Sequence, residues 1–240
     1  MMALNLIMLG PPGAGKGTQA ERFARERGLL MISAGDILRE SIKAGLPVAQ
    51  RAKELMDRGE LVDDATMIAI VRERLMRPDA QRGFVLDGFP RTVAQAEALD
   101  RIVAERNSGP LVVVDVRVPE RELVRRLAGR LICGKCGANA ELPTAGDAAP
   151  AACAGCGGEL VQRADDNEQV VRERLKVYER ATKPVVEFYH DRPAFRVVNG
   201  AQAPHLVAHE LDTVIDDAAL VGARQEAPVK AATAEKAART

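Results

Sequence analysis

The chain of 240 residues contains no tryptophan, two tyrosines and five phenylalanines, so aromatic residues make up only 3% of it. Proteins that bind single-stranded nucleic acid stack bases on aromatic side chains, and this composition argues against such a surface. The 34 Lys and Arg residues are balanced by 34 Asp and Glu residues. A nucleic-acid-binding domain is usually basic, so the zero net charge leads us to expect no nucleic-acid partner.

No apolar run approaches the roughly 20 residues that are needed to span a bilayer. The first residues also lack the basic stretch, apolar segment and small-residue cleavage site of a secretory signal. We therefore expect a cytoplasmic protein with no membrane partner. Cysteine is scarce as well: the four cysteines form two Cys-x-x-Cys pairs. In a reducing compartment such pairs indicate metal binding rather than disulfides.

The stretch from Gly10 to Thr18 reads GPPGAGKGT and lies between an apolar run, residues 4–9, and a helix that we expect to end at Gly28. In this context a glycine-rich loop can turn its backbone N–H groups toward phosphate oxygens, and the helix dipole adds to the attraction. Lys16 would reach the outer phosphates, and the hydroxyl of Thr18 could ligate magnesium. The alternative is a plain glycine-rich turn with a surface lysine. The loop predicts nucleoside triphosphate binding without identifying the reaction.

Strands alternate with helices along most of the chain. We expect strands over residues 4–9, 29–32, 83–87, 111–116 and 195–198, and helices over 19–27, 34–44, 48–56, 64–76, 92–107, 119–129, 165–189 and 206–220. This order predicts an α/β fold, a P-loop parallel five-stranded sheet flanked by helices. The glycine loop and the turn after Asp87 both follow strands, so they should meet at the carboxyl edge of the sheet, where such folds bind ligands.

The segment from Arg130 to Arg163 interrupts the alternation and contains all four cysteines. Sixteen residues separate the two pairs, which are Cys133 and Cys136, and Cys153 and Cys156. Two knuckles at this spacing can place four thiolates tetrahedrally on one zinc ion. Because four protein ligands leave no open position, we expect a structural zinc site. Free thiols or a redox pair are the alternatives.

Phosphoryl transfer requires aligned phosphates, neutralised charge and exclusion of water. Arginine suits this task because its planar guanidinium group binds phosphate oxygens through two parallel hydrogen bonds. The arginines near the predicted turns are Arg39, Arg91, Arg126, Arg130, Arg163 and Arg174. Taken singly, each is more typical of a solvated surface residue than of a ligand.

Five stretches together resemble the adenylate kinase family: GPPGAGKGTQ at 10–19, SAGD at 33–36, DGFPRT at 87–92, GR at 129–130 and RADDN at 163–167. The cysteine pairs resemble those of the long form of the family, which has a zinc-binding lid. The resemblance covers about residues 4–218. It implies a monomeric enzyme of adenine nucleotide homeostasis that transfers a phosphoryl group reversibly from MgATP to AMP, giving two ADP. The transfer would be in line, in an arginine-lined cleft beneath a closed lid.

The resemblance also implies residue roles. The catalytic residues would be Lys16, Arg91, Arg126, Arg130, Arg163 and Arg174. ATP would contact Gly13, Ala14, Gly15, Lys16, Gly17, Thr18, Arg126, Arg130 and Gln202. AMP would contact Ala34, Arg39, Glu60, Leu61, Val62, Gly88, Phe89, Pro90, Arg91, Gln95, Arg163 and Arg174, with Gln95 reading the adenine edge. Magnesium would be held by Thr18 and, partly through water, by Asp87.

By the same resemblance, residues 1–32, 63–129 and 168–221 form the P-loop core domain. Residues 33–62 form a helical AMP-binding insert, and residues 130–167 form the zinc-binding lid, whose closure would exclude water. We expect the segment 222–240 to be a disordered tail, because it is rich in Ala and charged residues and has little to bury.

Three departures from the family pattern leave alternatives open. Ala34 stands where the family often has Thr; pyrimidine monophosphate kinases also have Ala there, so a UMP/CMP kinase of the same family is the main alternative. Ala140 and Glu141 replace an aromatic and a histidine position of the lid, and Gln202 replaces a lysine of the adenine-binding turn. Gln95 also fits a capping box with Thr92, which would be a purely structural role. A less favoured reading is an ATP-driven protein whose zinc ribbon binds nucleic acid.

Overall fold

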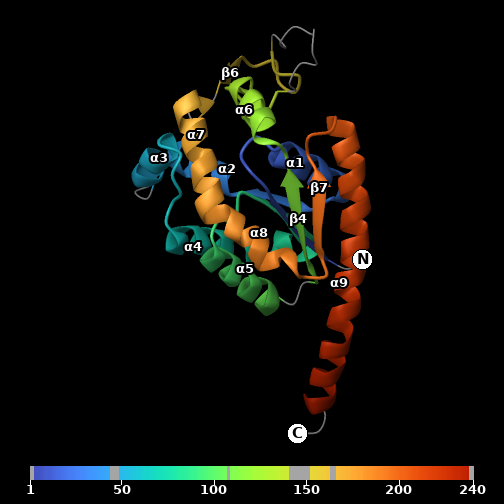
Figure 1. Cartoon of the computed structure of the whole chain (residues 1–240). Helices are drawn as coiled ribbons and strands as arrows, with labels where there is room; N and C mark the ends of the chain where they lie inside the picture. The colour runs from blue at the N-terminus through green and yellow to red at the C-terminus, as the bar shows by residue number, and fades with distance from the viewer. Residues whose placement is uncertain (1–2, 44–48, 107–108, 141–151, 163–165, 238–240) are drawn as a thin grey trace.

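A five-stranded parallel sheet lies at the centre of the computed structural model, which describes residues 3–43, 49–106, 109–140, 152–162 and 166–237 (Figure 1). In spatial order the strands are β2 (Leu30–Ser33), β3 (Gly83–Asp87), β1 (Leu4–Leu9), β4 (Leu111–Arg117) and β7 (Phe195–Asn199). Each neighbouring pair is parallel. This confirms the predicted α/β fold and places the five expected strands to within a residue or so.

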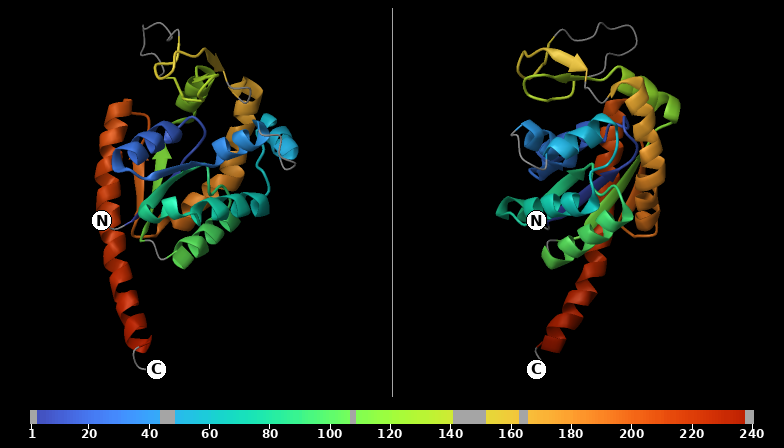
Figure 2. Two further views of the ribbon diagram at one scale, coloured as in Figure 1. Left: turned by 180° about the vertical axis from the view of Figure 1, so that it is seen from behind. Right: turned by 90° about the vertical axis from the view of Figure 1, so that its left-hand side faces the viewer.

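The two faces of the sheet pack against different helices, as the views in Figure 2 show. Successive side chains of a strand point to opposite faces, so Ile7 belongs to one core and Leu6 and Met8 belong to the other. The first core contains residues of α4 (Asp64–Leu75), α5 (Val93–Arg106) and α8 (Lys183–His190). The second contains residues of α1 (Lys16–Arg27), α6 (Glu120–Ala128) and α9 (Pro204–Ala237).

Two segments extend from this core. The helices α2 (Ala34–Lys43) and α3 (Ala49–Asp57) follow β2, and they lie beside the upper end of α7 (Glu168–Val177) in Figure 1. The cysteine-bearing segment forms its own antiparallel pair, β5 (Leu131–Cys133) with β6 (Leu160–Gln162), above the sheet. The sequence predicts a separate module here but not these two strands, because each is only three residues long. A short 3₁₀ turn, Pro78–Arg82, precedes β3.

The helix predicted over 165–189 is divided in the structure. A π-helical turn, Tyr178–Thr182, separates α7 from α8. Pro184 lies in the first turn of α8 and explains the division, because in an unbroken α-helix its ring would clash with the carbonyl four residues earlier and its hydrogen bond would be missing. The helix also begins later than predicted, at Glu168: Asn167 caps α7 by accepting a hydrogen bond of 3.0 Å from the N–H of Val170.

The last helix is longer than the sequence predicts. α9 continues to Ala237, which corrects the predicted end near Leu220 and covers most of the segment for which a disordered tail is predicted. Ala, Glu, Lys and Arg predominate beyond residue 222 and have high intrinsic helix propensity, which opposes the unfavourable effect of Pro228 within the helix. Residues 238–240 lie outside the described part of the chain.

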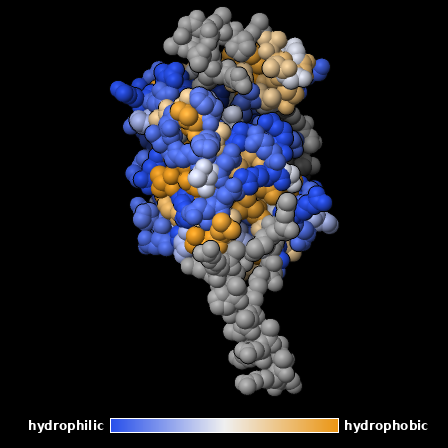
Figure 3. Space-filling model, turned by 90° about the vertical axis from the view of Figure 1, so that its right-hand side faces the viewer, coloured by the Kyte–Doolittle hydropathy of each residue, from blue (hydrophilic) through white to orange (hydrophobic). Residues whose placement is uncertain are grey.

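Figure 3 views the molecule from the side of α9 and shows hydrophobic residues in separate patches among hydrophilic ones. Leu206 and Leu220 of α9 and Val197 of β7 are among the exposed apolar side chains of the described residues. Scattered exposure of this kind is normal for a globular protein. Across the described residues, no helix has both the length and the apolar character that crossing a membrane would need.

Candidate active site

The loop between β1 and α1 wraps around its own lysine. Gly13 and Gly15 have φ angles of 84° and 86°, a left-handed conformation that glycine adopts without strain. Lys16 begins α1, and its Nζ donates hydrogen bonds to the carbonyl oxygens of Gly10 and Pro11, at 2.7 and 2.8 Å. The ammonium group is therefore held at the centre of the curled loop, as expected for a phosphate-binding loop.

The electrostatics of Lys16 show which charged groups surround it. The pKa of Lys16 is lowered from 10.5 to about 8, mainly by loss of hydration; Asp87 acts to raise it, and Arg91, Arg174 and Arg130 contribute to lowering it. Asp87 ends β3, and Arg91 lies in the loop after it. Arg130 lies between α6 and β5, and Arg174 lies on α7. The fold therefore brings three of the predicted arginines, distant in sequence, close to the glycine loop.

Asp87 lies directly against the loop. A Cβ atom placed on Gly17 would lie 3.1 Å from Oδ2 of Asp87, so the absence of a side chain at residue 17 leaves room for this carboxylate. Thr18, on the first turn of α1, is exposed. One hydroxyl and one carboxylate at the phosphate loop are the hard oxygen donors that a magnesium ion prefers, so these residues fit the predicted ion.

Arg130 and Arg174 share one buried carboxylate. Nε and Nη2 of Arg130 donate to the two oxygens of Asp166 at 2.6 Å each, and Nη1 of Arg174 donates to Oδ1 at 3.0 Å. The side chain of Asp166 is fully buried. Asp166 therefore orients both guanidinium groups. Sequence reasoning missed this role, since no spacing rule links residue 166 to residue 130.

Arg126 contacts the turn after β7, which lies against the loop. Its Nη1 donates to the carbonyl oxygen of Gly200 at 2.9 Å, and its Nε donates to Glu122 at 2.8 Å. Hydrogen bonds from Arg125 and Arg126 lower the pKa of Glu122 to about 2. Gly200 is adjacent to the loop, since a Cβ atom on it would lie 3.2 Å from the carbonyl oxygen of Ala14. The structure thus places Arg126 and the turn after β7 beside the phosphate loop.

The side chain of Gln202, in the turn after β7, forms hydrogen bonds with two neighbouring residues. Its Nε2 donates to Glu210 of α9 at 2.5 Å and to the carbonyl oxygen of Asn199 at 3.3 Å. These contacts hold the side chain between the turn and α9.

The predicted AMP-side residues divide into surface, core and loop positions. Arg39 pairs with Asp36 on the first turns of α2, and Glu60 pairs with Arg58 at 3.0 Å. Leu61 is half-buried, and Val62 and Phe89 belong to the first core. The peptide between Phe89 and Pro90 is cis.

Ala34, Gly88 and Arg91 lie together. A Cβ atom on Gly88 would lie 3.0 Å from Nη2 of Arg91 and 3.8 Å from Cβ of Ala34. Nε of Arg91 also donates to the carbonyl oxygen of Gly88 at 2.8 Å. Arg163 and Glu141 lie outside the described residues.

Gln95 is only 2% exposed. Its N–H donates to Oγ1 of Thr92 at 3.2 Å, which confirms one half of the predicted capping box. Its side-chain Oε1 accepts from the N–H of Arg91, and its Nε2 donates to Oδ1 of Asp64, each at 2.8 Å. Asp64 was not among the predicted site residues, because only the packing of α4 on α5 brings it to Gln95.

The four cysteine sulfur atoms form one cluster, with every pair within 4.8 Å. Sγ of Cys133 lies 3.5 Å from that of Cys156, and Sγ of Cys136 lies 3.7 Å from that of Cys153. A tetrahedral zinc ion with bonds of about 2.3 Å would set its sulfur ligands roughly 3.8 Å apart. Backbone N–H groups, first that of Cys136, lower the pKa of Cys133 to about 6 and favour its thiolate, whereas neighbouring cysteine sulfurs raise the pKa of Cys156 to about 12. The cluster therefore fits a metal ion.

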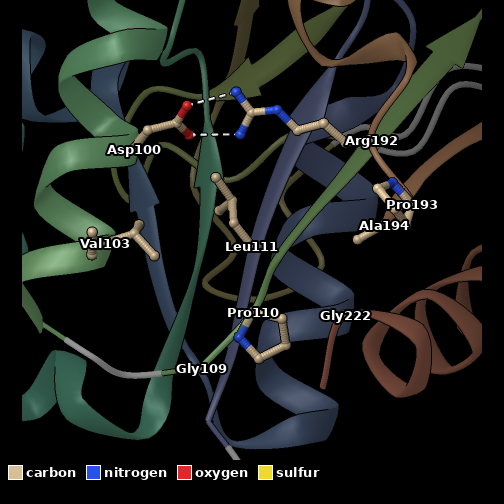
Figure 4. Close-up of a pocket in the computed structure, with 10 residues that line it drawn as sticks. Asp100, Val103, Gly109, Pro110, Leu111, Arg192, Pro193, Ala194 and Gly222 are labelled. Atoms are coloured by element: carbon tan, nitrogen blue, oxygen red, sulfur yellow. Dashed lines mark hydrogen bonds and ion pairs between the residues drawn. The ribbon is translucent and has the colours of Figure 1, made fainter. Parts of the chain in front are cut away.

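A pocket of about 420 Å³ lies at the amino ends of the strands, on the side of the sheet away from the glycine loop. It is near the start of β4 and the residues before β7 (Figure 4). Asp100 and Arg192 meet there through two hydrogen bonds of 3.0 and 2.6 Å. The Arg192 guanidinium group also lies over the rings of Phe188 and Tyr189. Because its charges are paired with each other, this pocket has the character of a structural junction between α5 and α8.

Comparison with known proteins gives a consistent result. The adenylate kinase family model matches residues 8–194. An adenylate kinase of Archaeoglobus fulgidus is 47% identical over 213 residues, which is 89% of this chain and 98% of the relative. Adenylate kinases of Geobacillus sp. (strain WCH70) and Syntrophobacter fumaroxidans are 51% and 47% identical, over 83% and 82% of this chain and 92% of each relative. The chain therefore belongs to the adenylate kinase family.

Proposed function

We propose that this protein transfers a phosphoryl group reversibly between MgATP and AMP, giving two ADP. The observation that carries the proposal is the gathering of Arg91, Arg130 and Arg174 around Lys16, beside Asp87. The phosphates of one nucleotide on the glycine loop would not need four positive charges from separate elements for neutralisation. Four charges match the phosphates of two nucleotides that meet end to end. Membership of the adenylate kinase family supports the same reaction.

On this proposal, one nucleotide lies on the glycine loop and the other lies at the turn after β3. ATP would be bound by residues 13–18, Arg126, Arg130 and the turn at Gln202. AMP would be bound by Ala34, Arg39, residues 60–62, residues 88–91, Gln95, Arg163 and Arg174. The support is the position of Arg126 and Gly200 beside Ala14, and of Ala34 and Gly88 beside Arg91.

The protein contributes alignment and charge. Arginine side chains held by Asp166 would contact the oxygens of the transferred group without having to reorganise. Such preorganised positive charge stabilises the transition state, in which negative charge is spread over those oxygens, and so lowers the barrier. Lys16 would neutralise the outer phosphates of ATP. Magnesium, held by Thr18 and Asp87, would supply further charge neutralisation when bound.

The cysteine cluster would hold a structural zinc ion, and the segment 130–167 would act as a lid that excludes water during transfer. The segment 33–62 would act as the AMP-binding region, and 1–32, 63–129 and 168–221 as the core. The monomeric state, the cytosolic location and the absence of nucleic-acid and membrane partners stay predictions.

The competing function is that of a UMP/CMP kinase. Pyrimidine monophosphate kinases also have Ala at the position of Ala34, which lies next to Gly88 in the proposed monophosphate site. A coupled assay of ADP formation with MgATP and AMP, UMP or CMP decides between them. We expect AMP to give the highest kcat/KM, and comparable or greater turnover of UMP or CMP would overturn the proposal. The Lys16→Met variant, which loses the loop charge, is the control and should be inactive while remaining folded.

A further inference from the structure

The side-chain amide of Gln95 is held at both ends. The backbone N–H of Arg91 donates to Oε1, and Nε2 donates to Oδ1 of Asp64, each at 2.8 Å. The amide is buried, so neither bond can be replaced easily by bulk water. Asp64 in turn receives a hydrogen bond of 2.9 Å from the hydroxyl of Thr92 on the same oxygen.

These partners permit one orientation of the amide. A carboxylate only accepts hydrogen bonds, and a backbone N–H only donates them. If the amide turned over, Oε1 would face the carboxylate of Asp64 and Nε2 would face the N–H of Arg91. One contact would then pair two acceptors and the other would pair two donors. Both hydrogen bonds would be lost in a buried environment.

Asp64 is well placed to hold this orientation. It is the first residue of α4, where the helix dipole favours a negative charge. Its contacts with Thr92 and Gln95 join the start of α4 to the start of α5. The carboxylate is thereby fixed by two helices, and the amide is fixed by the carboxylate.

We infer that Asp64 is a positioning residue that sets the nucleobase specificity of the monophosphate site. The inference rests on the proposed function, in which Gln95 reads the base. With the bonds described, Oε1 retains a second lone pair and Nε2 retains a second hydrogen. An acceptor beside a donor matches a base that presents an amino group beside an unprotonated ring nitrogen, as adenine does.

The same arrangement rejects bases that carry an oxo group. Hypoxanthine presents a carbonyl oxygen and a protonated ring nitrogen in the places of the amino group and the bare nitrogen of adenine. Pairing with it would require the amide to turn over, which Asp64 and the N–H of Arg91 oppose. Uracil has the pattern of hypoxanthine, whereas cytosine has the pattern of adenine and must be excluded by its size.

AMP and IMP are the matched substrates for a test, because they differ only at the edge in question. We expect the wild-type protein to prefer AMP over IMP by more than about 100-fold in kcat/KM, as for sites that hydrogen-bond a polar group of the substrate. The substitution Asp64→Asn keeps the shape and supplies an amide that can donate as well as accept. It should lower the AMP/IMP ratio about tenfold, because a turned Gln95 then keeps its partner at residue 64.

Asp63→Asn is the control. Asp63 is the adjacent carboxylate and caps α4 through Thr66, so this variant removes the same charge without changing the described contacts of Gln95. It should leave the AMP/IMP ratio within about twofold of wild type, even if it melts at a lower temperature. A general loss of stability changes both substrates alike and leaves the ratio unchanged.

Asp64→Ser, whose shorter side chain gives up the contact with Nε2 and so no longer fixes the amide, serves if Asp64→Asn does not fold. An AMP/IMP ratio in the folded variant that matches wild type, or a wild-type protein that uses IMP nearly as well as AMP, overturns the inference. A wild-type protein that does not phosphorylate AMP overturns the proposed function itself. The two failures are therefore distinguishable.

Discussion

Arg130 binds both oxygens of Asp166 at 2.6 Å, although the Asp166 side chain is fully buried. Asp166 also accepts from Arg174, so one carboxylate neutralises part of the charge of two guanidinium groups. A cluster of arginines without such a partner would repel itself in the interior of the protein. The carboxylate therefore makes the arginine cluster compatible with a folded chain.

The Asp166→Asn variant should be destabilised by about 3 kcal/mol, because it leaves two largely buried guanidinium groups without a counter-charge. Urea denaturation of the purified protein measures this change. The matched control is Glu168→Gln, which removes an exposed partner of Arg172 and should cost less than about 0.5 kcal/mol. Equal stability of the two variants would contradict the role of Asp166.

Nucleotide binding should be coupled to protonation of Lys16. The pKa of this side chain is lowered to about 8, so at pH of about 8.5 it is mostly neutral, and a bound polyphosphate would favour the charged form and raise the pKa. ATP binding should therefore take up protons at this pH and take up fewer near neutral pH, where Lys16 is already charged.

Titration calorimetry in buffers with different ionisation enthalpies, without magnesium, measures that uptake. The Lys16→Met variant cannot take up a proton at this position and provides the control. A binding enthalpy that does not depend on the buffer at the higher pH would show that the pKa of Lys16 does not change on binding.

Removal of the metal should destabilise the cysteine-bearing segment. We expect about one zinc ion per chain, released by Cys153→Ser or by a strong chelator, and a lower melting temperature in both cases. A colorimetric zinc assay and thermal unfolding followed by circular dichroism measure the two quantities. If chelator lowers the melting temperature of Cys153→Ser as much as that of wild type, the metal is bound elsewhere.

The π-helical turn is connected to the proposed monophosphate site. Oγ1 of Thr182 donates to the carbonyl oxygen of Arg91 at 3.0 Å. The isosteric change Thr182→Val should remove this bond at a cost of about 1 kcal/mol in stability and raise KM for AMP more than KM for ATP. Steady-state kinetics with each substrate varied in turn measures the difference.

Thr182→Ser keeps the hydroxyl and should restore KM for AMP. If Thr182→Ser raises KM for AMP as much as Thr182→Val does, or if neither variant raises it, the hydrogen bond of Thr182 does not determine KM for AMP.

The sequence predicts those parts of the molecule that depend on neighbouring residues. The apolar run at 4–9 and the glycines after it specify a strand and a loop within one short stretch, and the structure has both. Asp63, directly before the helix predicted over 64–76, caps α4 by accepting a hydrogen bond from the N–H of Thr66. The division of the helix at the turn before Pro184 was predictable from the same kind of local rule, but the apolar pattern on both sides concealed it.

The parts of the site that depend on long-range packing were not predictable. Asp166 meets Arg130 across 36 residues, and Asp64 meets Gln95 across 31. Neither contact follows from periodicity or spacing, because both depend on how helices pack after the sheet has formed. The resemblance to a family supplied the arginines and Gln95, but not the acidic residues that hold them.

The π-helical turn changes the rotation of α8 relative to α7. An extra residue in one turn rotates every later side chain by about 100° relative to an unbroken α-helix. The face on which α7 carries Arg174 is thereby uncoupled from the face on which α8 carries Tyr189, which is completely buried in the first core. One continuous stretch of chain can therefore present Arg174 to the arginine cluster and Tyr189 to the first core, which a helix without the π-helical turn would place at a different angle to each other.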